Sequence, residues 1–302
     1  MKVLILLATY NGAKFLNDQL NSIFTQNGVE VEVLINDDDS FDDTVIVIES
    51  FIAKGFNLKL TRSSKNSGTA ARNFFNLVHL VENPDDFDAF AFSDQDDIWE
   101  GQKIFQAVNE LNRTKSDLYA SELKIWGGGS EFQMTHKSQS QKEFDYLFEG
   151  ASAGCTYVFT PRLLKIAQLH FTNGVPSTWL YFSHDWFFYF IARQNHLKVF
   201  IDNQAFILYR QHENNAFGVS SRYSYAPFFR KIGLLGKRWY RVHLTHYRSI
   251  AGDKSREAEL IELFLSKSLG KRVKAILKFG GQLSRNRKKR LLIGFLTIFN
   301  RL

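Results

Sequence analysis

Short apolar runs alternate with segments of helical periodicity over residues 3–92, and this alternation constrains the fold most. The apolar runs that predict strands are residues 3–7, 31–35, 58–60 and 87–92, and the first of them is continuous, as is typical of a strand buried on both faces. The helical segments between them are residues 13–26, 45–52 and 68–80. Strands that alternate with helices form βαβ units, so we expect an α/β fold with a mixed, mostly parallel sheet.

The rest of the chain continues this pattern less regularly. Residues 118–126 are predicted as a strand, and residues 199–201 and 205–209 as two further separate strands. With 302 residues, of which 44% are hydrophobic, the chain can bury one large core and still carry an appendage. Cys155 is its one cysteine, so no internal disulfide can form.

Three carboxylates, Asp94, Asp96 and Asp97, directly follow the fourth apolar run. In open α/β sheets, ligands bind at the carboxyl ends of the strands. Carboxylates this close resist ionising together unless a cation compensates them. A hard divalent ion, Mg²⁺ or Mn²⁺, that also contacts phosphate oxygens would do so. The alternative interpretation of such a cluster is a solvated acidic turn.

A second acidic group, residues 37–43, follows the second apolar run. It is not an EF-hand calcium loop, because that pattern requires glycine where Asp42 stands and glutamate where Ile48 stands. One interpretation is a turn in which Asp42 or Asp43 caps the next helix. The other is recognition of a nucleotide base or ribose by a carboxylate. The local sequence leaves both open.

Four motifs occur in a fixed order along the chain. They are Ala8-Thr9-Tyr10-Asn11-Gly12, Asp37-Asp38, Asn66-x-Gly68-x-x-x-Arg72-Asn73 and Asp94-x-Asp96-Asp97. Together they resemble the inverting family 2 glycosyltransferases with a GT-A fold, over about residues 1–215. The runs Ser93-Asp94-Gln95-Asp96-Asp97-Ile98-Trp99 and Tyr209-Arg210-Gln211-His212 are similar to the bacterial rhamnosyltransferase branch. Asp39 departs from the family pattern, which usually has Gly or Asn there; aspartate tolerates a positive φ better than most residues.

The resemblance implies a site for a nucleotide-sugar donor. Thr9 and Tyr10 match the first nucleotide-contacting loop. Asp38 matches the acid that accepts a hydrogen bond from the pyrimidine N3–H, and Arg72 matches a basic residue near the nucleotide. Asp94 matches the first acid of the DxD motif, near the ribose and the metal.

The resemblance also implies a divalent metal, Mg²⁺ or Mn²⁺. Asp96 matches the second acid of the DxD motif, the direct metal ligand, and the leaving diphosphate needs the charge neutralisation that a metal supplies. His212 matches the position of a further metal or diphosphate ligand, and Arg210 could contact phosphate. An ordinary polar loop is the alternative interpretation of residues 210–215.

Asp185 matches the position of the general base. An inverting transfer needs one carboxylate to take the proton of the acceptor hydroxyl as this hydroxyl attacks the anomeric carbon. The alternative is that Asp185 caps the helix expected from Trp186. His184 could support Asp185, although a lone histidine more often packs or is solvated.

The resemblance implies transfer of L-rhamnose from dTDP-β-L-rhamnose to a saccharide hydroxyl during synthesis of a bacterial cell-surface polysaccharide. The expected acceptor is lipid-linked. The alternative is a family 2 hexosyltransferase that uses a UDP-sugar. A nucleotidyltransferase lacks support because residues 8–12 contain one glycine and no basic residue. A non-catalytic carbohydrate-binding module would not need the metal, nucleotide and base candidates.

Charge divides the chain into two predicted regions, a GT-A glycosyltransferase domain at residues 1–221 and a basic, mainly helical region at residues 222–302. The second region holds 20 Lys and Arg against 4 Asp and Glu. An anionic membrane surface is the expected partner, and nucleic acid is not, because no nucleic-acid motif accompanies the charge. We therefore expect a cytoplasmic protein, peripheral on the inner face of the cell membrane. A helical subdomain that packs on the core is the alternative.

Overall fold

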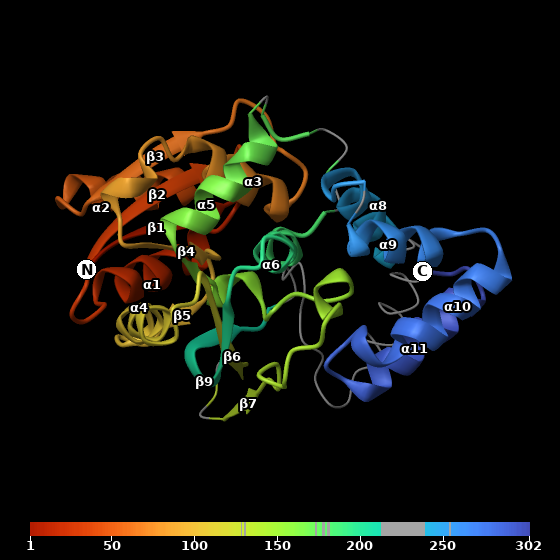
Figure 1. Ribbon diagram of the computed structural model, residues 1–302. Coiled ribbons are helices and arrows are strands. Elements are labelled where there is room, and N and C mark those ends of the chain that lie inside the picture. Colours follow the sequence, from red (N-terminus) through yellow and green to blue (C-terminus); the bar gives the residue numbers. More distant parts are fainter. Residues whose placement is uncertain are drawn as a thin grey trace. The chain divides into compact units, whose positions relative to one another are not determined.

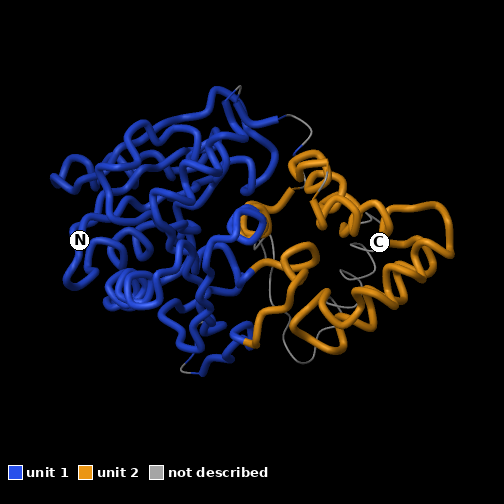
Figure 2. Tube along the Cα trace, viewed as in Figure 1, with its two compact units in different colours: residues 1–138, 151–180, 191–218 blue, residues 139–150, 181–190, 219–302 orange. Residues whose placement is uncertain are grey.

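The computed structural model describes residues 1–127, 129, 131–172, 174–176, 179, 182–212, 239–253 and 255–302 (Figure 1). The chain forms two compact units (Figure 2). Unit 1 comprises residues 1–138, 151–180 and 191–218, and unit 2 comprises residues 139–150, 181–190 and 219–302. The predicted boundary at residue 221 falls outside the described residues.

Unit 1 contains one nine-stranded sheet in the order β3-β2-β1-β4-β8-β6-β9-β5, with β7 paired to β6. The strands are β1 (Lys2–Thr9), β2 (Glu30–Asp37), β3 (Leu58–Arg62), β4 (Ala89–Ser93), β5 (Ile98–Trp99), β6 (Leu118–Trp126), β7 (Phe132–Met134), β8 (Val158–Phe159) and β9 (Val199–Arg210). Strands β1 to β4 pair in parallel, as do β6 and β9, and the other four pairings are antiparallel. The predicted α/β class and mixed sheet are confirmed.

Helices separate the strands of unit 1 along the chain, and the first three of them connect the parallel strands β1 to β4, as Figure 1 shows. They are α1 (Ala13–Phe24), α2 (Thr44–Ala53), α3 (Ala70–Leu80), α4 (Lys103–Thr114) and α5 (Pro161–Gln168), with 3₁₀ turns at Pro84–Asp86, Gly154–Thr156 and Leu169–Phe171. Helix α6 (His184–Gln194) follows α5. The apolar residues whose spacing predicts α1 form its buried face. Leu16, Leu20 and Ile23 are fully buried in one core cluster with residues of β1.

One sequence prediction about the sheet was wrong. Residues 199–201 and 205–209 form a single strand, β9, rather than two. The polar stretch Asp202-Asn203-Gln204 suggested a break. The ladder between β6 and β9 instead absorbs it through register shifts between Ala120 and Lys124. Bulges of this kind let a strand continue past residues that do not fit its alternation.

Unit 2 is mainly helical, which confirms the prediction for the C-terminal region. Its helices are α8 (Trp239–Ile250), α9 (Arg256–Leu265), α10 (Leu269–Phe279) and α11 (Arg287–Ile298), with 3₁₀ turns at Asp145–Leu147 and Gly280–Gln282. Glu149 accepts hydrogen bonds from the Arg285 backbone N–H at 2.8 Å and from Lys289 Nζ at 3.2 Å. Part of the basic charge therefore holds this unit together. Within the described residues, no helix has the length and apolarity needed to cross a bilayer.

Candidate active site

The carboxyl ends of β1, β2 and β4 bring the predicted motifs of unit 1 together. In the ladder, Thr9 at the end of β1 pairs with Asp37 at the end of β2. Leu7 of β1 pairs with Ser93 at the end of β4. The Thr9 hydroxyl donates to Asp37 Oδ1 at 3.1 Å, which fixes the two strand ends to each other. The acids after β2 and those after β4 therefore leave the sheet at one edge, as the sequence predicts.

Asp38 is buried, and the loop before α3 holds its carboxylate. Oδ1 accepts from the Ser67 N–H at 2.9 Å and Oδ2 accepts from the Ser67 hydroxyl at 2.8 Å. Burial raises the pKa of Asp38, and the two Ser67 hydrogen bonds partly offset this rise. The next residue, Asp39, has φ 67°, so this position does adopt the left-handed conformation that favours glycine or asparagine.

Asn73 fixes the start of α3 to the ends of β1 and β2. Its Nδ2 donates to the carbonyls of Thr9 and Asn36 at 3.1 and 3.0 Å, and its Oδ1 accepts from Asn36 Nδ2 at 2.8 Å. Arg72 lies one residue earlier in the same turn. Its buried Nε has no hydrogen-bond partner among the described residues. A buried guanidinium N–H in this state is suited to an acceptor supplied by a ligand.

Gln95 joins the acidic turn to the loop after β1. Its Oε1 accepts from the Tyr10 N–H at 2.8 Å, and its Nε2 donates to the Tyr10 carbonyl at 3.0 Å. Gly12 leaves room for this carboxamide, because a Cβ at position 12 would lie 2.1 Å from Gln95 Oε1. Tyr10 as a residue is 44% exposed, and its ring packs edge-on against Phe41. The backbone of the loop is therefore held while its aromatic ring stays accessible.

Asp96 and His212 are brought into contact across 116 residues of sequence. Asp96 Oδ2 lies 2.7 Å from His212 Nε2, and both side chains are mostly buried. The His212 ring also packs against Phe15, with ring centroids 4.7 Å apart. The two residues predicted as metal ligands are thus neighbours, and each presents a donor atom of a type that divalent metals bind.

Arg210 supports the acidic turn from β9. The backbone N–H of Arg210 donates to Asp97 Oδ1 at 3.3 Å, and the side-chain Nε donates to the Asp96 backbone carbonyl at 3.0 Å. Its Nη2 forms an ion pair with Asp18 at 2.9 Å, and the guanidinium stacks over Phe15. These contacts tie Arg210 to the geometry of the turn. A direct contact of Arg210 with a donor phosphate remains a prediction.

Asp97 is fully buried beside Asp94 and Cys155. Donor atoms of Asp94, Asp97 and Cys155 lie within 4.8 Å of one another. Burial raises the pKa of Asp97 well above its ordinary value, and the charges of Asp94 and Asp96 raise it further. Its Oδ2 has no hydrogen-bond partner among the described residues.

These residues fit a hard divalent cation. Three carboxylates share a confined space, and a positive charge beside them would relieve their mutual repulsion. Carboxylate oxygen suits Mg²⁺ and Mn²⁺. The thiol of Cys155 is a soft donor and does not suit them, and burial raises its pKa well above the usual value. The structure gathers donor atoms of Asp94, Asp97 and Cys155 and separately pairs Asp96 with His212, so metal binding by Asp94, Asp96 and His212 remains a prediction.

Asp185, the predicted base, lies in the first turn of α6 and belongs to unit 2. Its Oδ1 accepts from the Trp186 N–H at 2.9 Å and from the Ser183 hydroxyl. Burial lowers the pKa of the preceding His184 to about 4, so this ring is neutral at pH 7. The Ser183 N–H donates to His243 Nε2 at 3.2 Å, which fixes the residue before α6 to α8.

The second acidic group proves to be partly structural. Asp42 Oδ1 accepts from the Thr44 N–H at 3.0 Å at the start of α2, and Asp42 Oδ2 accepts from the Ala13 N–H at 3.2 Å. Asp37 accepts from the Ser40 N–H and hydroxyl at 2.9 and 2.6 Å. These two acids organise the loop. Asp38 is the member of the group that faces the loop before α3.

Sequence reasoning missed the residues that position the site. Asn73 and Gln95 stand inside quoted motifs, but nothing in the sequence says that their amides bind backbone groups of other loops. Lys103 was also missed: it is buried, its Nζ lies 3.5 Å from the Trp99 ring centroid, and burial lowers its pKa to about 7. The sequence signal for its burial was its position at the start of a predicted helix, next to apolar residues.

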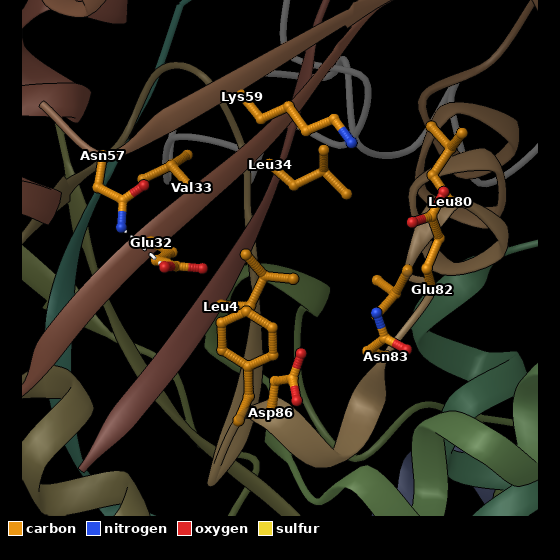
Figure 3. A pocket seen from close by; sticks show the side chains of 12 residues that line it. Leu4, Glu32, Val33, Leu34, Asn57, Lys59, Leu80, Glu82, Asn83 and Asp86 are labelled. Atoms are coloured by element: carbon orange, nitrogen blue, oxygen red, sulfur yellow. Dashed lines mark hydrogen bonds between the residues drawn. The ribbon is translucent and has the colours of Figure 1, made fainter.

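A cavity of about 180 Å³ lies away from all these residues (Figure 3). Leu4, Leu34 and Phe87 contribute apolar lining, and the Asn57 amide donates to Glu32 at 2.8 Å at its margin. It borders the amino-terminal parts of β1, β2 and β3, whereas the predicted site lies at their carboxyl ends. None of the predicted site residues lines it.

This mixed sheet, with acids at the ends of β2 and β4, is the arrangement that the sequence predicts for a GT-A fold. The family model "Glycosyl transferase family 2" matches residues 4–182. The chain belongs to this family and is a glycosyltransferase.

Among individual relatives, the chain is 34% identical to the dTDP-rhamnosyl transferase RfbG of Shigella flexneri. The similarity extends over 266 residues, which are 88% of each of the two chains. It is similar in structure to S. aureus TarS 1–349 in complex with UDP-GlcNAc, with a TM-score of 0.61 at 18% identity over 100% of this chain and 89% of that one. The mannosyltransferase PcManGT of Pyrobaculum calidifontis, in complex with GDP-Man and Mn²⁺, gives a TM-score of 0.56 at 14% identity over 98% and 86%. The predicted family and GT-A fold are confirmed.

Proposed function

We propose that this glycosyltransferase transfers L-rhamnose from dTDP-β-L-rhamnose to a saccharide hydroxyl, with inversion. The observation that carries the proposal is the 34% identity, over 88% of both chains, to a relative named as a dTDP-rhamnosyl transferase. A one-step displacement from a β-L donor gives an α-L-rhamnoside. The acceptor is a lipid-linked saccharide in the synthesis of a bacterial cell-surface polysaccharide.

The donor nucleotide binds over the ends of β1 and β2. Asp38 accepts from the N3–H of thymine, and Ser67 keeps its carboxylate aimed. The exposed Tyr10 lines the nucleotide loop. The buried Thr9 supports this loop through the hydrogen bond from its hydroxyl to Asp37. The unpartnered Nε of Arg72 supplies a donor to the nucleotide.

Asp94, Asp96 and His212 hold Mg²⁺ or Mn²⁺ in this proposal. When bound there, the metal neutralises the charge that develops on the leaving diphosphate. A protein of similar fold, the mannosyltransferase PcManGT, has been solved in complex with GDP-Man and Mn²⁺. Arg210 holds the Asp96–Asp97 turn against β9 and adds positive charge toward the diphosphate.

Asp185 is the proposed general base. Its carboxylate accepts the proton of the acceptor hydroxyl while the hydroxyl oxygen attacks the anomeric carbon of the donor sugar. Ser183 and the Trp186 N–H orient this carboxylate. Residues 1–221 then carry the catalytic residues, and residues 222–302 form the basic region.

Calorimetric titration tests the donor site. We expect dTDP-β-L-rhamnose with Mg²⁺ or Mn²⁺ to bind at least about tenfold more tightly than UDP-N-acetylglucosamine, a difference of about 1.4 kcal/mol. A chelator should weaken donor binding, and Asp96→Asn should remove the effect of the metal. Preference for the UDP-sugar would favour the alternative, a family 2 hexosyltransferase.

A further inference from the structure

Two helices of unit 2, α10 and α11, carry large apolar side chains that remain exposed. On α10, Leu269, Val273 and Leu277 recur every four residues and therefore share one face. Leu277 is 82% exposed. Isolated exposed leucines are common, but a row of them on one helix face is not.

Helix α11 repeats this arrangement on its outward side. The apolar residues Leu291, Phe295 and Ile298 follow helical spacing and are exposed by 69%, 58% and 40%. Ile293 and Leu296, at the intervening positions, are buried. Leu292 and Phe299 lie beside the exposed row and are also exposed.

The two rows border one another. Ile276 of α10 lies 4.0 Å from the position that a Cβ at Gly294 of α11 would take, so the helices approach closely there. By the helical period, Leu277 follows Ile276 on the helix surface and lies on the face of α10 opposite its buried residues. In the same way, Phe295 follows Gly294 and lies on the face of α11 opposite its buried residues. The eight residues therefore form one surface, the α10–α11 apolar face: Leu269, Val273, Leu277, Leu291, Leu292, Phe295, Ile298 and Phe299.

The charge around this face indicates what covers it. Residues 267–302 contain 11 Lys and Arg and no Asp or Glu. Arg272 and Arg285 are buried and bind carbonyls or Glu149. Exposed cations remain on these two helices and beside them in sequence: Lys271, Lys274, Arg287, Lys288 and Arg301. A second copy would bring the same positive charge against it, and a nucleic acid offers nothing to bury the exposed Leu and Phe side chains.

We propose that the α10–α11 apolar face inserts into the interface of an anionic lipid bilayer, with the surrounding lysines and arginines at the headgroups. With 12 residues, α11 is about 18 Å long, too short to cross a hydrocarbon core of about 30 Å, so it lies in the plane of the interface. The proposal deepens the one on the lipid-linked acceptor, but it does not depend on the identity of the donor sugar.

Cosedimentation of the full chain with vesicles tests this proposal without donor or acceptor. We expect binding to vesicles of phosphatidylcholine with phosphatidylglycerol, weak binding to phosphatidylcholine alone, and loss of binding as salt rises. Leu291→Ser with Phe295→Ser should weaken binding at least about tenfold. Leu169→Ser is the matched control, since Leu169 is 70% exposed in unit 1 and should have no effect.

A second pair of variants tests the charge. Lys274→Glu with Lys288→Glu should weaken binding to anionic vesicles by about tenfold or more, whereas Lys54→Glu in unit 1 should not. All these residues are exposed, so the urea midpoint should stay unchanged. Three results would overturn the proposal: equal binding of variants and parent, concentration-dependent dimers that the Leu291→Ser with Phe295→Ser variant abolishes, or binding to duplex DNA in preference to vesicles. A failure of rhamnosyl transfer would leave the vesicle result standing.

Discussion

Gly12 and Gln95 should be strongly coupled, because one makes room for the other. Alanine at position 12 would put its Cβ 2.1 Å from Gln95 Oε1, far closer than any ordinary contact. The carboxamide must then swing away and lose both hydrogen bonds to the Tyr10 backbone. The Gly12 backbone itself, at φ −106°, accepts alanine without strain.

The magnitude follows from those two hydrogen bonds. Each is worth about 1 kcal/mol net, and less where water can replace it, so Gln95→Ala should cost about 1–2 kcal/mol of unfolding free energy. Gly12→Ala should cost the same amount plus about 0.5–1 kcal/mol, since alanine is a poor N-cap for α1. In the Gln95→Ala background only this capping cost remains. The coupling energy of the pair is therefore about 1–2 kcal/mol.

Urea unfolding of the parent, both single variants and the double variant measures this cycle. The double variant should be about as stable as Gly12→Ala alone. Donor affinity should follow the same pattern, because both changes release the Tyr10 loop. Additive losses in the double variant would refute the idea that Gln95 acts through the space that Gly12 leaves.

The remaining predictions concern catalysis and acid stability. Asp96→Asn should lower the transfer rate by at least about 10²-fold with an unchanged urea midpoint, and substantial activity would remove Asp96 from the metal site. Asp185→Asn should lower transfer by about 10²–10⁴-fold while donor affinity in calorimetry stays constant; an unchanged rate would leave Asp185 as a structural residue. Burial lowers the pKa of His243 to about 3, so the unfolded chain takes up this proton first as pH falls below 6.5, and about 2–3 kcal/mol of stability should be lost by pH 4.5. His243→Gln should flatten this pH dependence in urea titrations and the exposed control His79→Gln should not; equal slopes would contradict the assignment.

The architecture around the site could be predicted because it depends on local patterns. Apolar runs bounded by polar turns predicted β1 to β4. Because ligand sites lie at the carboxyl ends of strands in open α/β sheets, the sequence also placed Asp38 and Asp94 at one edge of the sheet. The positive φ of Asp39 agrees with the Gly or Asn that the family usually has at this position. Each of these inferences needs only neighbours in sequence and the periodicity of strands and helices.

The residues that orient the site could not be predicted in the same way. Gln95 and Asn73 act through backbone atoms of Tyr10, Thr9 and Asn36, 37 to 85 residues away in sequence. An amide side chain gives no sign of such a partner. The continuity of β9 depends likewise on a register shift against β6, which is a property of the paired strands and not of either one alone.

The central claim is rhamnosyl transfer, and a donor screen tests it most directly. The full chain would be incubated with lipid-linked saccharides, Mg²⁺ or Mn²⁺, and either dTDP-β-L-rhamnose or UDP-sugars, with nucleoside diphosphate release and the anomeric configuration of the product as readouts. We predict release of dTDP, formation of an α-L-rhamnoside, and loss of both in Asp185→Asn. Turnover of a UDP-sugar in place of dTDP-β-L-rhamnose, or a β-linked rhamnoside, would contradict the account.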